Sequence, residues 1–304
     1  MVLQLFKYPF TAMGSPCEIQ LYSTSSSYAA GAAQAIIFDI ERLQSKYSRY
    51  VPESFLSEIN RVALKGRKLA IDEETASLLN YAQTCYEQSD GLFDISSGVL
   101  RKVWNFKQTD FVDVPSMEQI HRLLKHVGWD KVRWTTSSLA FLSKNMELDF
   151  GGIVKEYAAD RAAAIAYAME LKHGIVNLGG DIRVIGPHPD GNPWRIGIQD
   201  PRRKGAVLNV VDLKHGAMAS SGDYERCIEI NGQRYSHILN PKTGFPVNYL
   251  AAVTVTSELC VLAGSASTIA MLKASQGANW LSGLGLPHLW VTVDGKIGGD
   301  LVVH

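Results

Sequence analysis

The sequence lacks the features of several common protein classes. Its 304 residues contain only four cysteines, which are widely spaced and form no CxxC pair, so we expect buried reduced thiols rather than a zinc site. The 30 basic and 30 acidic residues cancel, so no net field attracts nucleic acid or an acidic membrane surface. No stretch reaches the roughly 18 consecutive apolar residues that a membrane span needs. We therefore predict a protein that binds no nucleic acid and has no membrane span.

The N-terminal segment lacks an export signal as well. Residues 1–7 contain no basic stretch followed by a long apolar run and a small-residue cleavage site. If this is the native start, a cytoplasmic location is expected. The chain shows no repeat, no low-complexity tract and no clear linker, and its length allows a large core. We therefore expect residues 1–304 to form a single domain or two intimately packed lobes.

Hydrophobic periodicity predicts helices mainly in the first half of the chain and strands mainly in the second. The expected helices cover residues 29–43, 72–91, 115–127, 152–171 and 259–273. The expected strands cover residues 17–21, 175–178, 182–185, 195–198, 207–213, 226–230 and 253–256, with a final hairpin that turns at 294–295. This distribution differs from a regular βαβ alternation. It predicts an α+β fold with mixed or antiparallel sheets and flanking helices.

Two glycine-rich segments are candidates for binding phosphate. Residues 149–155 (Asp-Phe-Gly-Gly-Ile-Val-Lys) stand at the start of the expected helix 152–171. Glycine lets a ligand approach the backbone, free amides at a helix N-terminus favour phosphate, and Lys155 adds a positive charge. A strand-to-helix turn with a surface lysine explains this segment equally well. Residues 177–181 (Asn-Leu-Gly-Gly-Asp) indicate a hairpin turn first and a phosphate nest second.

Three other segments carry groups suited to chemistry, each with a structural alternative. His237 ends an expected strand and has a side chain suited to proton transfer near neutral pH, although a lone histidine is more often structural. The hydroxyls of residues 264–268 can serve a metal or bond to helix carbonyls. The aromatic residues in 47–50 and 91–94 can stack on a flat ring or simply fill a core. None of these segments identifies a function alone.

Taken in order, these segments resemble the ApbE family of magnesium-dependent flavin transferases. The resemblance runs from about residue 8 to the C-terminus. It rests on residues 11–15, 47–50 with 54–60, 91–94, 149–157, 177–181, 220–224, 237–244 and 253–268. Each motif is weak by itself, but eight motifs in the family's order are specific.

The resemblance implies an FAD site between two intimately packed lobes. Seven residues match family positions that hold the flavin or line the FAD site: Met13, Tyr50, Leu92, Phe93, Asp94, Asp149 and Lys155. His237, with Ile238 beside it, matches the histidine of the transfer step. Gly152 matches the residue whose backbone carbonyl binds Mg²⁺, and Thr268 matches the threonine whose hydroxyl does so.

The implied activity is transfer of FMN from FAD to a threonine hydroxyl of an acceptor flavoprotein, with release of AMP and assistance from Mg²⁺. Cleaving a pyrophosphate needs positioning and charge neutralisation more than a nucleophile from this chain, because the acceptor supplies the hydroxyl. Two alternatives are an FAD-binding or flavin-delivery protein without efficient transfer, and an FAD pyrophosphatase that yields FMN and AMP.

One position departs from the family pattern in a way that matters for the metal. Gly264 stands four residues before Thr268, where the family usually has an aspartate, so a hard cation loses a carboxylate ligand there. Either Thr268, the Gly152 carbonyl, phosphates and water hold the cation, or another carboxylate such as Glu258 substitutes. A third possibility is that efficient transfer is lost. The change Gly264→Asp would restore the carboxylate.

Overall fold

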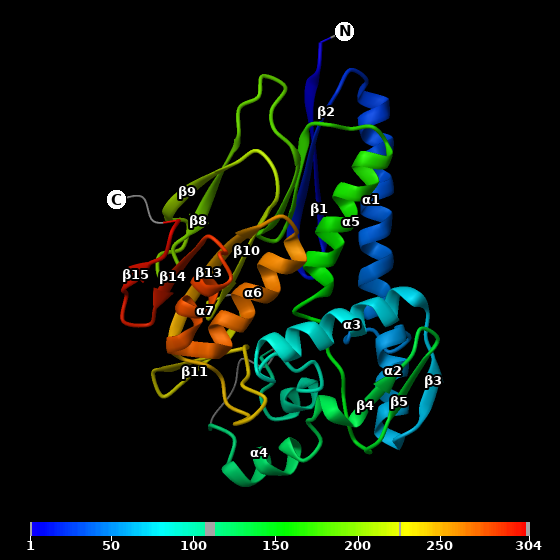
Figure 1. Ribbon diagram of the computed structural model, residues 1–304, viewed down its shortest axis with the longest axis vertical. Helices are drawn as coiled ribbons and strands as arrows, with labels where there is room; N and C mark the ends of the chain where they lie inside the picture. Colours follow the sequence, from blue (N-terminus) through cyan, green and yellow to red (C-terminus); the bar gives the residue numbers. More distant parts are fainter. Residues whose placement is uncertain (1, 107–112, 225, 302–304) are drawn as a thin grey trace.

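An eight-stranded antiparallel sheet is the frame of the fold (Figure 1). The computed structural model describes residues 2–106, 113–224 and 226–301. In spatial order the strands are β1 (Gln4–Ala12), β2 (Ser15–Ser23), β6 (Gly174–Leu178), β7 (Asp181–Gly186), β10 (Ala217–Gly222), β13 (Leu250–Ser257), β14 (His288–Thr292) and β15 (Ile297–Gly298). The predicted α+β class is confirmed. Strands β1 and β10 were not predicted.

Both faces of this sheet are covered. Helices α1 (Ser26–Tyr47), α5 (Val154–Ala168) and α6 (Cys260–Lys273) pack on one face, where Val176, Ala219 and Val253 point toward them. The hairpin of β8 (Trp194–Gln199) and β9 (Val207–Leu213) covers the other face, where Val184 and Met218 lie in a second apolar cluster. Because both faces are dry, β13 is buried along almost its whole length.

A smaller unit of helices and short strands lies below the large sheet in Figure 1. It contains α2 (Phe55–Lys65), α3 (Glu73–Gln88), α4 (Met117–Leu124), the sheet β3 (Lys68–Ala70), β5 (Ser138–Phe141) and β4 (Val132–Trp134), and the hairpin β11 (Cys227–Ile230) and β12 (Gln233–Ser236). Helix α7 (Gly277–Gly283) instead packs beside α6. One apolar cluster includes Ile36 of α1, Leu79 of α3 and Val253 of β13, so the core is continuous across the two units. Among the described helices, none is both long and apolar enough to cross a bilayer.

Polar side chains cap the starts of α1 and α3. The side chain of Ser25 accepts the Tyr28 N–H before α1, and Asp72 accepts the Thr75 N–H before α3. Helix α5 begins at Val154, two residues later than predicted, because residues 151–153 form a turn. Helix α4 is shorter than predicted. The helical spacing predicts that Ile120, Leu123, Leu124 and Val127 are buried, but only Ile120 is fully buried, since α4 lies at the edge of the molecule.

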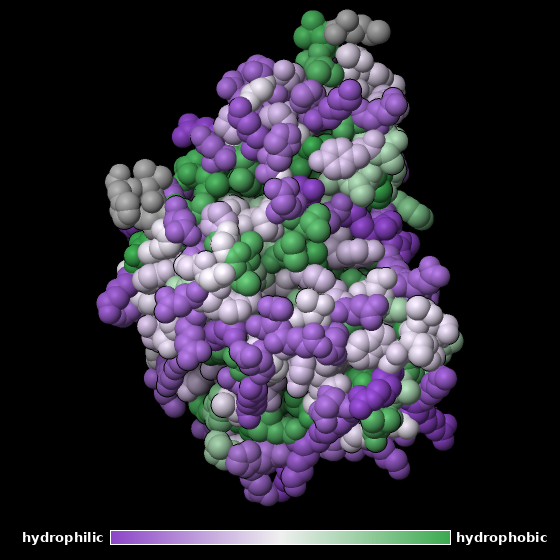
Figure 2. Space-filling view, in the orientation of Figure 1, coloured by the Kyte–Doolittle hydropathy of each residue, from purple (hydrophilic) through white to green (hydrophobic). Residues whose placement is uncertain are grey.

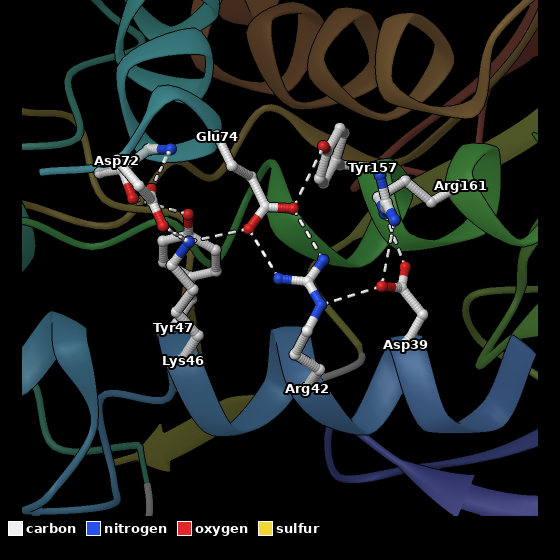
Figure 3. A network of polar contacts seen from close by, with 9 residues as sticks. Asp39, Arg42, Lys46, Tyr47, Asp72, Glu74, Tyr157 and Arg161 are labelled. Atoms are coloured by element: carbon white, nitrogen blue, oxygen red, sulfur yellow. Dashed lines mark hydrogen bonds and ion pairs between the residues drawn. The ribbon is translucent and has the colours of Figure 1, made fainter. Parts of the chain in front are cut away.

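A network of ion pairs joins α1, α3 and α5 (Figure 3). Arg42 of α1 donates to both carboxylate oxygens of Glu74, each at 2.8 Å, and Lys46 donates to Glu74 at 2.8 Å. Arg161 of α5 donates to Asp39 of α1 at 2.6 Å, and Arg42 reaches the same carboxylate at 2.9 Å. The network fixes the C-terminal half of α1 against the start of α3 and the middle of α5.

The Glu74 carboxylate in this network gives the protein a defined acid sensitivity. Hydrogen bonding from Arg42, with Lys46 beside it, lowers the pKa of Glu74 from 4.5 to about 2. The stabilisation is therefore complete above pH 4.5 and is lost as the pH falls toward 2. We expect Glu74→Gln to lower the unfolding free energy at pH 7 by up to about 3 kcal/mol. The deficit relative to wild type should shrink between pH 4.5 and 3 in urea titrations. A deficit that does not change with pH would contradict this assignment.

Candidate active site

Two tight turns lie side by side at one end of the large sheet, because β2 pairs with β6. The turn between β1 and β2 consists of Met13 and Gly14, whose φ values of 52° and 76° are typical of a two-residue hairpin. The backbone N–H of Met13 donates to the side chain of Gln44 in α1. In the turn between β6 and β7, a side chain at Gly179 would lie 2.8 Å from the hydroxyl of Ser15. The hairpin predicted for residues 177–181 is therefore confirmed.

The turn that opens α5 is held by Asp149. One carboxylate oxygen of Asp149 accepts the N–H of Gly151 at 2.9 Å, and the other forms an ion pair with Arg49, just beyond the end of α1. Gly152 lies on the ring of Phe93, since a Cβ there would be 3.3 Å from Cζ. The contacts bring three predicted site residues, Asp149, Gly152 and Phe93, to the same turn.

A buried ion pair links the start of α5 to the sheet. Lys155 Nζ lies 2.7 Å from Asp181 Oδ2 at the start of β7, and the Asp181 side chain is only 3% exposed. Burial raises the pKa of Asp181, whereas the Lys155 charge favours the ionised carboxylate. Lys155 also acts on the thiol of Cys17, whose pKa burial raises. Lys155 is thus directed toward the end of the sheet where the two turns lie.

His237 follows β12 and is held in one tautomer. Its ring Nδ1 lies 3.1 Å from the backbone carbonyl of Arg226, which can only accept a hydrogen bond. Nδ1 therefore carries the proton and Nε2 is left as the basic nitrogen. Burial, together with the positive charges of Arg226, Arg49 and Lys155, lowers the pKa of His237 to about 4. The imidazole is consequently neutral at physiological pH, in a positively charged environment.

Tyr50 lies at the outer side of this group. Arg49 donates to the Tyr50 hydroxyl at 2.8 Å and its guanidinium lies 4.9 Å from the ring centroid. Arg226 reaches the same hydroxyl at 3.4 Å. The Tyr50 side chain is 46% exposed, so one part of its ring is open to a ligand.

The remaining predicted flavin-site residues lie deeper. Ile238 is buried, and Leu92 packs partly buried against the main core. Asp94 is also buried, accepts the N–H of Ser96 at 2.8 Å, and has its pKa raised by burial. The contacts found for Asp94 run to Ser96 and Trp129 rather than to the charged residues. A direct flavin contact for Leu92, Asp94 or Ile238 stays a prediction.

Thr268 of α6 is tied to the same end of the sheet. Its hydroxyl lies 2.9 Å from the hydroxyl of Ser221 in β10. The neighbouring Ser220 gives a backbone hydrogen bond to Asp181, the partner of Lys155. Thr268 is therefore separated from the Lys155–Asp181 pair by the two neighbouring serines of β10, and the charge of Lys155 in turn acts on His237.

The chain is similar in sequence and structure to known proteins. The model of the ApbE family matches residues 13–289. The chain belongs to the ApbE family. A crystal structure of the ApbE protein from Thermotoga maritima superposes with a TM-score of 0.90 at 33% identity, covering 98% of this chain and 97% of that one. The apo flavinyl transferase ApbE from Pseudomonas stutzeri gives a TM-score of 0.87 at 26% identity, covering 98% and 95%.

Curated ApbE relatives carry the name FAD:protein FMN transferase. That of Haemophilus influenzae is 32% identical over 243 residues, which are 77% of this chain and 69% of the relative. That of Rhodobacter capsulatus is 29% identical over 264 residues, 85% of this chain but half the length of the relative. The family is thus an enzyme family, and its named activity is flavin transfer.

In this ApbE-family chain another side chain fills the space beside Gly264. A Cβ on Gly264 would lie 2.8 Å from Oε1 and 2.9 Å from Cδ of Glu156, a side chain of α5 that is 7% exposed. Glu258, the substitute considered from sequence, is exposed just before α6. An aspartate at position 264 would therefore fit only if the Glu156 side chain moved.

Sequence reasoning did not single out four charged residues of this group: Arg49, Glu156, Asp181 and Arg226. Arg49, Glu156 and Asp181 lie inside the motifs 47–50, 149–157 and 177–181, and their proximity to aromatic and glycine residues is a usable signal. Arg226 meets Tyr50 across 176 positions of sequence, and Glu156 meets Gly264 across a helix interface. No spacing along the chain encodes such long-range contacts.

Proposed function

We propose that this chain transfers FMN from FAD to a threonine hydroxyl of an acceptor flavoprotein, with release of AMP. The observation that carries the proposal is the neutral histidine, His237, with Lys155, Arg49 and Arg226 around it. Such a set suits a reaction on a pyrophosphate dianion, where positive charge binds the substrate and an uncharged imidazole accepts a proton. The named activity of the relatives supports the same conclusion.

The residues divide into binding and reacting groups. The pyrophosphate lies against the turn that opens α5, where the N-terminus of the helix favours negative charge, with Lys155 as its cation. Tyr50 and Met13 lie nearby to hold the flavin portion. Asp181 holds Lys155 in position, and its charge offsets part of the positive field. The two packed units then meet at one substrate site within a single catalytic domain.

The chemical step needs one proton acceptor. The acceptor threonine oxygen attacks the phosphorus of the FMN half, a new P–O bond forms, and the P–O bond to AMP breaks with its electron pair leaving on AMP. His237 Nε2 takes the hydroxyl proton, because Nδ1–H is already held by the Arg226 carbonyl. The products are FMN–threonine phosphoester and AMP.

The residues present fit a magnesium ion at the pyrophosphate. Thr268 would supply its hydroxyl and Gly152 its carbonyl. Within the described ranges, no group of three or more His, Cys, Asp or Glu residues is placed to hold a metal. Mg²⁺ is usually held by one or two carboxylates together with substrate phosphates. When bound, Mg²⁺ supplies neutralisation of the pyrophosphate charge.

An assay with and without acceptor protein tests the activity. The protein is incubated with FAD, MgCl₂ and an acceptor flavoprotein, and a Thr→Val version of the acceptor serves as the control. We expect the acceptor to gain one FMN phosphoryl group by mass spectrometry, AMP to appear in equal amount, and neither event with the control. Equal release of AMP and free FMN without acceptor would instead show a pyrophosphatase. Bound FAD that stays intact for hours would show a binding protein.

A further inference from the structure

Helices α5 and α6 place a buried carboxylate opposite a glycine. Glu156, in the first turn of α5, is 7% exposed, and its Cδ and Oε1 lie within 3 Å of where a Cβ of Gly264 would be. Burying a carboxylate is costly unless a partner or a cation compensates for it. No side chain at 264 competes for this space, so Gly264 is what allows Glu156 to occupy it.

The position of this carboxylate relative to the site follows from helix geometry. Residues four apart lie on the same face of a helix, so Gly264 lies on the same side of α6 as Thr268. Glu156 lies in the first turn of α5, directly after the turn that contains Gly152, and it meets α6 at Gly264. The carboxylate therefore lies against the face of α6 that carries Thr268, close in sequence to the Gly152 turn.

We propose that Glu156 is the carboxylate through which this chain binds Mg²⁺, reaching the metal from α5 through the space that Gly264 leaves open. The inference rests on the proposed function, which supplies the pyrophosphate and the reason for a metal. Oxygen ligands that include one or two carboxylates are what Mg²⁺ prefers. In this chain the carboxylate has moved from one helix to the facing one, and the missing aspartate marks no loss of the metal site.

A purely structural role for Glu156 is the competing explanation. A carboxylate in the first turn of a helix interacts favourably with the helix dipole. That role would lower stability on substitution but would leave metal binding unchanged. Metal binding must therefore be measured separately from folding and from transfer.

The test compares a variant that lacks the Glu156 carboxylate of α5 with one that carries a carboxylate at position 264 of α6 instead. Binding of Mn²⁺, as a spectroscopic substitute for Mg²⁺, is followed by EPR on FAD-free protein, and the rise in Tm with MgCl₂ is recorded against NaCl of equal ionic strength. Glu156→Gln should weaken Mn²⁺ binding by at least about tenfold and abolish the Mg²⁺-dependent rise in Tm. The double change Glu156→Ala with Gly264→Asp should recover most of both, because Ala removes the atoms that the new aspartate would meet.

Two controls keep the outcomes separate. Glu258→Gln removes an exposed carboxylate at the start of α6 and should bind Mn²⁺ like wild type. Tm measured in EDTA shows that each variant is folded. The inference is overturned if Glu156→Gln binds Mn²⁺ with wild-type affinity, or if the double variant binds Mn²⁺ no better than the single variant Glu156→Ala. Neither result would contradict the proposed FMN transfer. If wild type itself neither binds Mn²⁺ nor transfers FMN, the proposed function fails instead.

Discussion

His237→Ala lowers the rate of FMN transfer by at least about 100-fold, with FAD affinity changed only a few-fold. A positioned general base contributes about 10²–10⁴-fold, and Nε2 of His237 is the nitrogen left basic by the Arg226 contact. Steady-state AMP release with saturating acceptor gives the rate, and flavin fluorescence gives the affinity. His121→Ala, at an exposed position on α4, is the control and should leave both values unchanged.

The pH dependence of the same reaction tests the state of His237. Burial and the neighbouring cations lower the pKa of His237 to about 4, so the neutral base is present above that pH and is lost only below it. The ratio kcat/KM reports the free enzyme, and it should show no fall from this group between pH 8 and 6. An inflection near pH 6.5 that disappears in His237→Ala would contradict the assigned environment.

Lys155→Met lowers the unfolding free energy by about 3–5 kcal/mol, the usual cost of leaving one partner of a buried ion pair alone. Asp181, whose side chain is 3% exposed, would keep its charge without the lysine 2.7 Å away. FAD binding should weaken by about 10- to 100-fold as well, because a charged hydrogen bond to the pyrophosphate is lost. Urea denaturation and fluorescence titration measure the two effects.

Two further variants distinguish the stability cost of the unpaired buried carboxylate from the loss of FAD affinity that follows from removing the lysine charge. Adding Asp181→Asn to Lys155→Met should restore much of the stability but none of the FAD affinity. Lys296→Met breaks the exposed pair with Asp294 and should change the unfolding free energy by no more than about 1 kcal/mol. Full stability in Lys155→Met would show that the buried pair is not what the structure indicates.

Strands β1 and β10 of the large sheet could not be predicted, because their residues give a weak strand signal. Strand β10 consists mostly of small residues, Ala-Met-Ala-Ser-Ser-Gly, since α6 packs closely on it, and small residues have low strand propensity. Strand β1 contains Pro9, which argues against a central strand but is tolerated at the edge, where β1 lies. Strands such as β2, with clear alternation, and helices such as α1 and α3, with good caps, were predicted correctly.

The candidate site, like the fold, could be predicted from the sequence only in part. Motif order was enough to bring Asp149, Lys155, His237 and Thr268 into one hypothesis. In the structure, Lys155 and Arg49, the partner of Asp149, act by charge on His237, whereas Thr268 contacts Ser221. The contact between Glu156 and Gly264 could not be predicted, because it depends on how two helices face each other. A glycine at position 264 by itself suggests that a metal ligand has been lost. The structure shows that the Glu156 carboxylate of the neighbouring helix lies beside this glycine.

A crystal structure of the protein with bound FAD tests the central claim most directly, namely that the turn opening α5 receives the pyrophosphate. We expect the phosphates against the turn that opens α5 and within hydrogen-bond distance of Lys155, with the flavin ring beside Tyr50 and the reacting phosphorus facing His237. Density for FAD at any other surface, with this turn and Lys155 untouched, would contradict the account.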